Sequence, residues 1–214
     1  MTDSPISDAV ERLQGGRTSD DVWGREVVAL RERQASGALA IGERFPDGDL
    51  LTATGEPTTL TATLGGAAGV VVFYRGAWCP YCNLALAAYR DDLSGPLRDR
   101  GIVLAAVSPQ VPDGSMTMRE KHSLDFEVLS DPGNQIGTAL GIVARPSDEY
   151  IKAQLAQGMD LTELNGDGTI NLPMPTVAIV DAAGRLAWID VHPDYSTRTE
   201  PAEVLAALVR LGMC

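Results

Sequence analysis

Two cysteines three residues apart are the residues of this chain best suited to chemistry. They stand in the run WCPYC at 78–82, after an apolar stretch at 70–74 and before a run of helix-forming residues. That order predicts a strand, a short loop and a helix whose first turn holds both cysteines. Backbone N–H groups and the helix dipole stabilise a thiolate there, so we expect the pKa of Cys79 to fall below its usual value of about 8.5. Cys79 is therefore the candidate nucleophile, and Cys82, about one turn further on the same face, can form a disulfide with it.

The alternative to a redox pair is half of a zinc site, because Cys-x-x-Cys is also a common ligand spacing. Zinc would need two further ligands, and the chain offers Cys214, His122 and His192, with no second closely spaced pair. The redox interpretation is therefore favoured, and it requires no metal and no cofactor. Pro80 agrees with it, since an early helical position makes no use of the missing N–H. Either histidine could act as a base, although a lone histidine is more often structural.

The composition is that of an acidic globular protein. Its 214 residues are 44% hydrophobic, enough for one domain with an extension and a sizeable core. The net charge of −12 argues against nucleic acid or an anionic membrane as a partner, since both bind clusters of Lys and Arg. No apolar run approaches the roughly 20 residues that span a bilayer, and the first residues lack the pattern of a signal peptide. We therefore expect a cytoplasmic protein, in which three cysteines indicate catalytic thiols rather than structural bridges.

Residues 1–40 are expected to form a helical extension to a main domain at 41–214. Apolar residues at helical spacing predict two short helices there, and Thr18 followed by Asp21 gives a capping-like start to the second, which is expected to end near Gly37. The two apolar stripes are Ile6, Val10 and Leu13, and then Trp23, Val27 and Leu30. Such stripes must be covered, either by their own domain, which is favoured, or by a second subunit in a homodimer.

The main domain shows the alternation of strands and helices that is typical of an α/β fold. The apolar run 102–107, bounded by Gly101 and by Ser108-Pro109, predicts a buried parallel strand. With the strand at 70–74 and the intervening helix, expected to end near 94–96, it forms a βαβ unit with a right-handed crossover. The remaining expected elements are short β segments within 42–64, a helix at 115–122, a strand at 126–131, helices at 135–141 and 147–158 (Ile151 and Leu155 on one side), strands at 177–180 and 186–191, and a helix from Pro201.

The motif at 78–82 resembles the active site of the thioredoxin superfamily, with the Pro-Tyr pair found in glutaredoxins. The later segment 174–181 resembles the one that holds the superfamily's cis-proline, which implies a cis Met174–Pro175 bond facing the cysteines. The region 43–60 and the stretch 107–142 resemble parts that AhpC/TSA peroxiredoxins carry in addition. The resemblance implies a thioredoxin-like α/β fold of the peroxiredoxin variant, with a central mixed β-sheet flanked by helices.

The resemblance also implies which residues surround the cysteines. AhpC/TSA peroxiredoxins carry a Pro seven residues before the reactive cysteine, a Thr or Ser three before it, and an Arg just before the late strand. Here those positions hold Val72, Gly76 and Met174. The family's hydroxyl and guanidinium bind the peroxide oxygens, and Arg75 is the only nearby cation in sequence that could substitute. The candidate substrate contacts are Arg75, Trp78, Pro80, Tyr81, Met174, Pro175 and Thr176.

Three functions are compatible with these residues. The leading one is a peroxiredoxin-like enzyme, in which a hydroperoxide oxidises Cys79 to a sulfenic acid and Cys82 condenses with it to a disulfide that a thioredoxin- or glutaredoxin-type partner reduces. The second is a thioredoxin-like reductase that acts on a protein disulfide. The third is a binding or scaffold protein with an incidental motif. Cys214 could resolve the disulfide or link subunits, although a free thiol on a frayed tail is the simpler interpretation.

Overall fold

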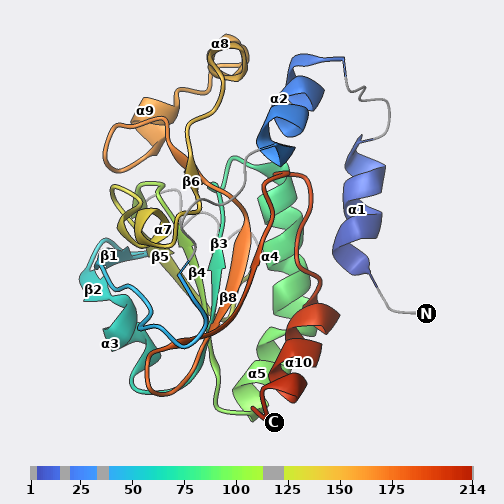
Figure 1. Cartoon of the computed structure of the whole chain (residues 1–214). Coiled ribbons are helices and arrows are strands. Elements are labelled where there is room, and N and C mark those ends of the chain that lie inside the picture. The colour runs from blue at the N-terminus through green and yellow to red at the C-terminus, as the bar shows by residue number, and fades with distance from the viewer. Residues whose placement is uncertain (1–3, 15–19, 33–38, 113–122, 214) are drawn as a thin grey trace.

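The structure is a computed structural model that describes residues 4–14, 20–32, 39–112 and 123–213. Within these residues the chain folds around one seven-stranded sheet with strand order β2-β1-β5-β4-β3-β8-β9 (Figure 1). The expected helix at 115–122 and the residue Cys214 lie outside the described residues.

The sheet is mixed, as the resemblance implied. Strand β3 runs parallel to β4, the middle strand of the seven, and β4 runs parallel to β5, which confirms the predicted βαβ arrangement. On the other side, β8 pairs antiparallel with β3 and with β9. The strands are β1 (Asp49–Thr52), β2 (Pro57–Thr59), β3 (Gly69–Phe73), β4 (Val103–Ser108), β5 (Glu127–Ser130), β8 (Thr176–Val180) and β9 (Leu186–Val191).

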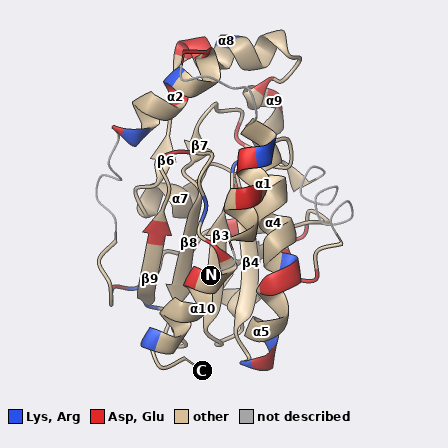
Figure 2. Cartoon of the chain, turned by 90° about the vertical axis from the view of Figure 1, so that its right-hand side faces the viewer, with Lys and Arg blue, Asp and Glu red and all other residues tan. Residues whose placement is uncertain are grey.

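Helices cover both faces of the sheet, because each central strand is apolar on both sides (Figure 1). Val70 and Val72 of β3 face a cluster formed with α1, α4, α5 and α10, whereas Val71 and Phe73 face a cluster formed with α3 and α7. Figure 2 shows that β4 and β8 carry no charged residue, whereas charged residues lie on several helices and on β9. These helices are α1 (Pro5–Gln14), α3 (Leu60–Leu64), α4 (Pro80–Asp92), α5 (Ser94–Asp99), α7 (Gln135–Ala139) and α10 (Pro201–Arg210).

A second group of elements lies above the N-terminal end of α4 in Figure 1. It contains α2 (Val22–Arg31), α8 (Asp148–Ala156), α9 (Leu161–Leu164) and the short pair β6 (Val143–Ala144) and β7 (Leu172–Pro173). Because α4 begins directly after Cys79, this group surrounds the end of the helix where the motif lies.

The two N-terminal helices pack against their own chain. Ile6 is 1% exposed and belongs to the core cluster around α4. The Glu200 carboxylate accepts hydrogen bonds from the backbone N–H groups of Ile6 (3.1 Å) and Ser7 (2.7 Å), so it caps α1 from the far end of the chain. Asp21 caps α2 by accepting from the Gly24 N–H at 2.7 Å. This helix ends at Arg31, earlier than the expected end near Gly37.

Two details of the expected elements were wrong, and a third element buries residues that the expectation did not name. Residues 60–64 form helix α3 rather than β structure, because the Thr59 hydroxyl caps its first turn. The helix after the cysteines ends at Asp92, and α5 follows as a separate helix. Helix α8 buries Tyr150 and Gln154, whereas Leu155 is 49% exposed. The last difference brings a phenol toward the cysteines.

Candidate active site

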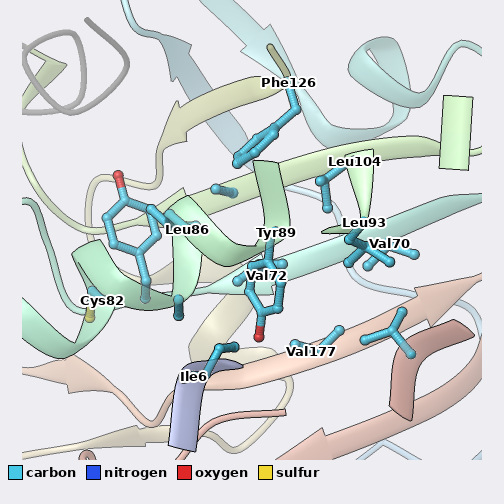
Figure 3. Close-up of a cluster of buried hydrophobic side chains, with 14 of the residues drawn as sticks. Ile6, Val70, Val72, Cys82, Leu86, Tyr89, Leu93, Leu104, Phe126 and Val177 are labelled. Carbon is cyan, nitrogen blue, oxygen red and sulfur yellow. The ribbon is translucent and has the colours of Figure 1, made fainter. Parts of the chain in front are cut away.

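The two cysteines lie at the start of α4, as predicted. Cys79 is the N-cap residue, Pro80 is the first helical residue, and Cys82 follows two positions later within the first turn. Both are free thiols, and they are 1% and 0% exposed. Figure 3 shows Cys82 on the same helix as Leu86 and Tyr89, at the edge of the buried cluster. The pair is therefore walled in by the core on one side.

Two buried arginines flank the pair. Arg198, 8% exposed, donates from Nη2 to Cys82 Sγ at 3.2 Å and from Nη1 to the Thr197 carbonyl at 2.6 Å. Arg75, 4% exposed, acts on both thiols through its charge. None of the ion pairs found among the described residues includes either guanidinium. Buried cations need a counter-charge, and the sulfur pair is placed to provide it.

The negative charge of the reduced pair rests on Cys82. Burial opposes ionisation there, but a hydrogen bond from Cys79 and the charge of Arg198 outweigh it and lower the pKa of Cys82 to about 5. Burial and the hydrogen bond to Cys82 raise the pKa of Cys79 well above its usual value. The prediction that Cys79 itself carries the depressed pKa is therefore wrong for the reduced state. The reason is that the helix start is not the dominant field, because a guanidinium lies against the other sulfur.

Arg75 is held by aromatic rings rather than by a carboxylate. Its guanidinium carbon lies 4.4 Å from the ring centre of Tyr195, 5.2 Å from that of Trp78 and 5.3 Å from that of Tyr150. Its Nη2 donates to the Tyr150 hydroxyl at 2.8 Å. Such stacking stabilises a desolvated cation without neutralising it. The positive charge therefore remains available to the thiols and to a bound molecule.

A cavity of about 230 Å³ opens beside Cys79. Its walls come from the motif, from α2, from α8 and from the segment after β9, and they are mainly aromatic. Sequence reasoning predicted the part made by Arg75, Trp78, Pro80 and Tyr81. It missed the remaining wall residues, which are Trp23, Tyr150, Gln154, Gln157, Met159 and Tyr195.

Comparison with known proteins gives this arrangement its family. The AhpC/TSA family profile matches residues 41–189, which include the motif, α4, and the strands of the main sheet up to Ile189 in β9. The chain belongs to the AhpC/TSA family.

Relatives of this AhpC/TSA chain are peroxiredoxins by name. A putative peroxiredoxin of Mycobacterium tuberculosis is 33% identical over 103 residues, which cover 48% of this chain and 64% of that protein. The peroxiredoxin Bcp of Escherichia coli is 29% identical over 104 residues, covering 49% of this chain and 65% of that protein. The matched parts thus span less than two thirds of these relatives.

Solved structures of AhpC/TSA-like proteins share the fold. The peroxidoxin BcpB of Mycobacterium tuberculosis superposes with a TM-score of 0.61 at 19% identity, over 81% of this chain and 97% of that one. A peroxiredoxin-like protein of Aquifex aeolicus gives 0.63 at 16% identity, over 83% of this chain and 90% of that one.

The AhpC/TSA hydroxyl position is closed in this chain. Gly76 has φ +144°, and a Cβ there would lie 2.4 Å from Nε1 of Trp78 and 2.7 Å from Oε1 of Gln110. That amide oxygen accepts the backbone N–H of Ala77 at 2.6 Å. A Thr or Ser side chain cannot be accommodated without displacing these groups.

The late AhpC/TSA segment lies near the cysteines but with a different backbone from the one expected. No cis peptide bond occurs in the described residues, so the prediction of a cis Met174–Pro175 bond is wrong. The Met174 N–H donates to the Ile142 carbonyl and the His192 N–H to the Pro175 carbonyl, which continue an extended chain from β7 into β8. Pro175 and Thr176 line a small void with Cys82, whereas Met174 lies beside Arg75.

His192 holds the segment after β9 rather than a sulfur. Its Nδ1 is 2.8 Å from the Thr197 hydroxyl and its Nε2 is 3.0 Å from the Asp190 carboxylate. Arg198, the functional residue that sequence reasoning missed, follows directly on that segment. No motif marks it, and it lies 116 residues from Cys82 in sequence.

The described residues contain neither a helix suited to crossing a membrane nor a cluster of metal ligands. No helix among them is both long and apolar enough to cross a membrane. They also bring together no group of three or more potential metal ligands of the His, Cys, Asp or Glu type.

Proposed function

We propose that this AhpC/TSA chain is a two-cysteine thiol peroxidase that reduces hydroperoxides through Cys79 and Cys82. The observation that carries the proposal is a pair of buried free thiols flanked by two buried guanidiniums, with Cys79 at the wall of a cavity of about 230 Å³. A cavity of this size suits a small molecule.

The first step transfers one oxygen atom to Cys79. The thiol proton of Cys79 passes along the hydrogen bond to the Cys82 thiolate, and the Cys79 sulfur then attacks the outer oxygen of the hydroperoxide. A sulfur–oxygen bond forms and the oxygen–oxygen bond breaks, leaving a sulfenic acid and an alkoxide. The alkoxide then takes up one proton and leaves as the alcohol, so that Cys82 is again a thiolate. Arg75 stabilises the negative charge on the Cys79 sulfur and on the departing oxygen during this step.

The second step makes the disulfide. The Cys82 thiolate attacks the sulfenic sulfur, the sulfur–oxygen bond breaks, and hydroxide leaves to become water. Two electrons have then passed from the two sulfurs to the peroxide. A dithiol partner of the thioredoxin or glutaredoxin type, present in a reducing compartment such as the cytoplasm, would return them.

The alternative is a thioredoxin-like disulfide reductase with little peroxidase activity. Gly76 favours it, because the hydroxyl that family members place near the reactive sulfur has no room in this chain. Under this alternative Cys79 attacks the disulfide of a partner protein and Cys82 resolves the mixed disulfide.

One experiment separates the two functions. The reduced Cys214→Ser protein is mixed with one equivalent of hydrogen peroxide, and the loss of free thiols is followed by quenching. We expect loss within seconds, and a sulfenic acid on Cys79 when Cys82 is replaced by Ser. Loss over hours, together with a mixed disulfide trapped from a protein-disulfide substrate by the same variant, would instead support the reductase. Cys79→Ser serves as the control without a nucleophile.

A further inference from the structure

Tyr150 supplies a hydroxyl to the cavity beside Cys79. It lies on α8, is 2% exposed, and lines the cavity together with Cys79. Its ring packs edge-on against Trp23, with ring centres 5.0 Å apart and planes at 87°. The ring is thus fixed by α2 on one side and by Arg75 on the other. A phenol held in this way has little freedom to turn.

The oxygen of Tyr150 already accepts two hydrogen bonds. Arg75 Nη2 donates to it at 2.8 Å and Gln154 Nε2 donates at 2.7 Å. These two donors use the acceptor capacity of a phenolic oxygen, so its O–H is left to donate. No hydrogen bond within the described part of the chain uses that proton. Burial raises the pKa of Tyr150, so the hydroxyl keeps its proton at neutral pH.

We propose that Tyr150 is a catalytic residue whose hydroxyl donates a hydrogen bond to the departing oxygen of the hydroperoxide. It takes over, from helix α8, the hydroxyl function that Gly76 leaves vacant next to the cysteine. The inference rests on the proposed peroxidase activity and adds a residue to it. Arg75 and Gln154 strengthen the donor, since bonds accepted by an O–H group polarise it.

Tyr150 acts in this step only as a hydrogen-bond donor. The Cys79 sulfur forms a bond to the outer oxygen, the oxygen–oxygen bond breaks, and negative charge develops on the inner oxygen. The Tyr150 O–H stabilises that charge by a hydrogen bond and keeps its own proton. The proton that completes the alcohol is the one that Cys79 gave up to Cys82.

The test compares leaving groups in Tyr150→Phe, which keeps the ring and deletes the hydroxyl. Single-turnover oxidation of reduced protein is followed by tryptophan fluorescence with tert-butyl hydroperoxide and with peracetic acid. An alkoxide needs a donor far more than acetate does. We therefore expect Tyr150→Phe to be slowed about 100-fold with the alkyl hydroperoxide and less than about tenfold with the peracid, as for removal of one oxyanion donor. A role confined to packing would slow both reactions equally.

Two further variants complete the test. Tyr89→Phe is the matched control, because the buried Tyr89 hydroxyl donates to the Thr199 carbonyl at 2.8 Å, and we expect wild-type ratios for both peroxides. Gln154→Leu removes one donor to the Tyr150 oxygen and is expected to slow the alkyl hydroperoxide about threefold. If Gln154 instead accepted the tyrosine proton, this variant would be faster than wild type, and the inference would be overturned.

The outcomes also separate this inference from the proposed function. The role of Tyr150 alone is overturned if wild type is oxidised rapidly and Tyr150→Phe is either as fast as wild type or slowed by the same factor with both peroxides. Wild type that reacts with neither peroxide overturns the peroxidase and this role with it. Should Tyr150→Phe fail to fold, the direction of the Gln154→Leu effect decides the question.

Discussion

Replacing Arg198 by Met should raise the pKa of Cys82 and thereby lower the fraction of thiolate at neutral pH to about half. Arg198 Nη2 lies 3.2 Å from Cys82 Sγ, and both side chains are buried. At this separation Coulomb's law gives about 5 kcal/mol with an effective dielectric constant of about 20, or more than about three pKa units. The guanidinium charge is delocalised and Arg75 remains, so we expect a rise of about two units, from about 5 toward about 7.

The assay is the ultraviolet absorbance of the thiolate as a function of pH, in a Cys214→Ser background. Cys82→Ser gives the baseline, and Arg198→Lys is the matched variant that keeps the charge and loses the planar fork. Arg198 also bonds to the Thr197 carbonyl, so thermal unfolding of the disulfide form measures the structural loss without a thiolate. A transition that stays near pH 5 in folded Arg198→Met would refute the reasoning.

Three further predictions follow from the same contacts. The folded pKa of Cys82 is lowered to about 5, whereas an unfolded thiol has a pKa of about 8.5. The free energy of unfolding of the reduced protein should therefore rise as pH increases from about 5 to about 8.5, and this gain should be lost as pH falls through 5. Denaturant titrations of the reduced and disulfide forms measure this, and an equal pH dependence in both would contradict it. Gly76→Thr should destabilise the protein by about 2 to 4 kcal/mol in urea unfolding and bring no faster peroxide reduction, since its side chain meets Trp78; unchanged stability would show that the contact relaxes freely. Glu200→Gln should cost about 1 to 2 kcal/mol and speed hydrogen exchange at Ile6 and Ser7 before it does so in α4, whereas uniform exchange across the chain would argue against a local cap.

The parts of the fold that were predicted are those that local pattern determines. The apolar runs of β3 and β4 predict buried parallel strands, and the motif between them predicts a helix start with two thiols, all as observed. The parts that were missed depend on contacts distant in sequence. Arg198 donates to Cys82 from the segment after β9, and Tyr150 of α8 lines the cavity beside Cys79, but nothing in the local sequence of either residue marks it as functional.

The prediction of which cysteine has the lowered pKa was wrong for the same reason. Position in a helix favours a charge on Cys79, and this argument needs only the local sequence. The lowered pKa of Cys82 follows from the hydrogen bond of Cys79 and from the guanidinium that the segment after β9 places against its sulfur. A prediction from the motif alone cannot contain that cation.

The capping of α1 by Glu200 has a consequence for how this chain can be shortened or diversified. Glu200 stands two residues after Arg198, so the first helix and the thiolate's cation share one anchoring point, and both lie outside the family segment at 41–189. Trimming the polypeptide to that segment would preserve the dithiol and Arg75 but remove Arg198, the cation that donates to Cys82. Substitutions in the first helix or in the segment that holds Arg198 and Glu200 are therefore expected to change the reactivity of the cysteines while the motif itself stays intact.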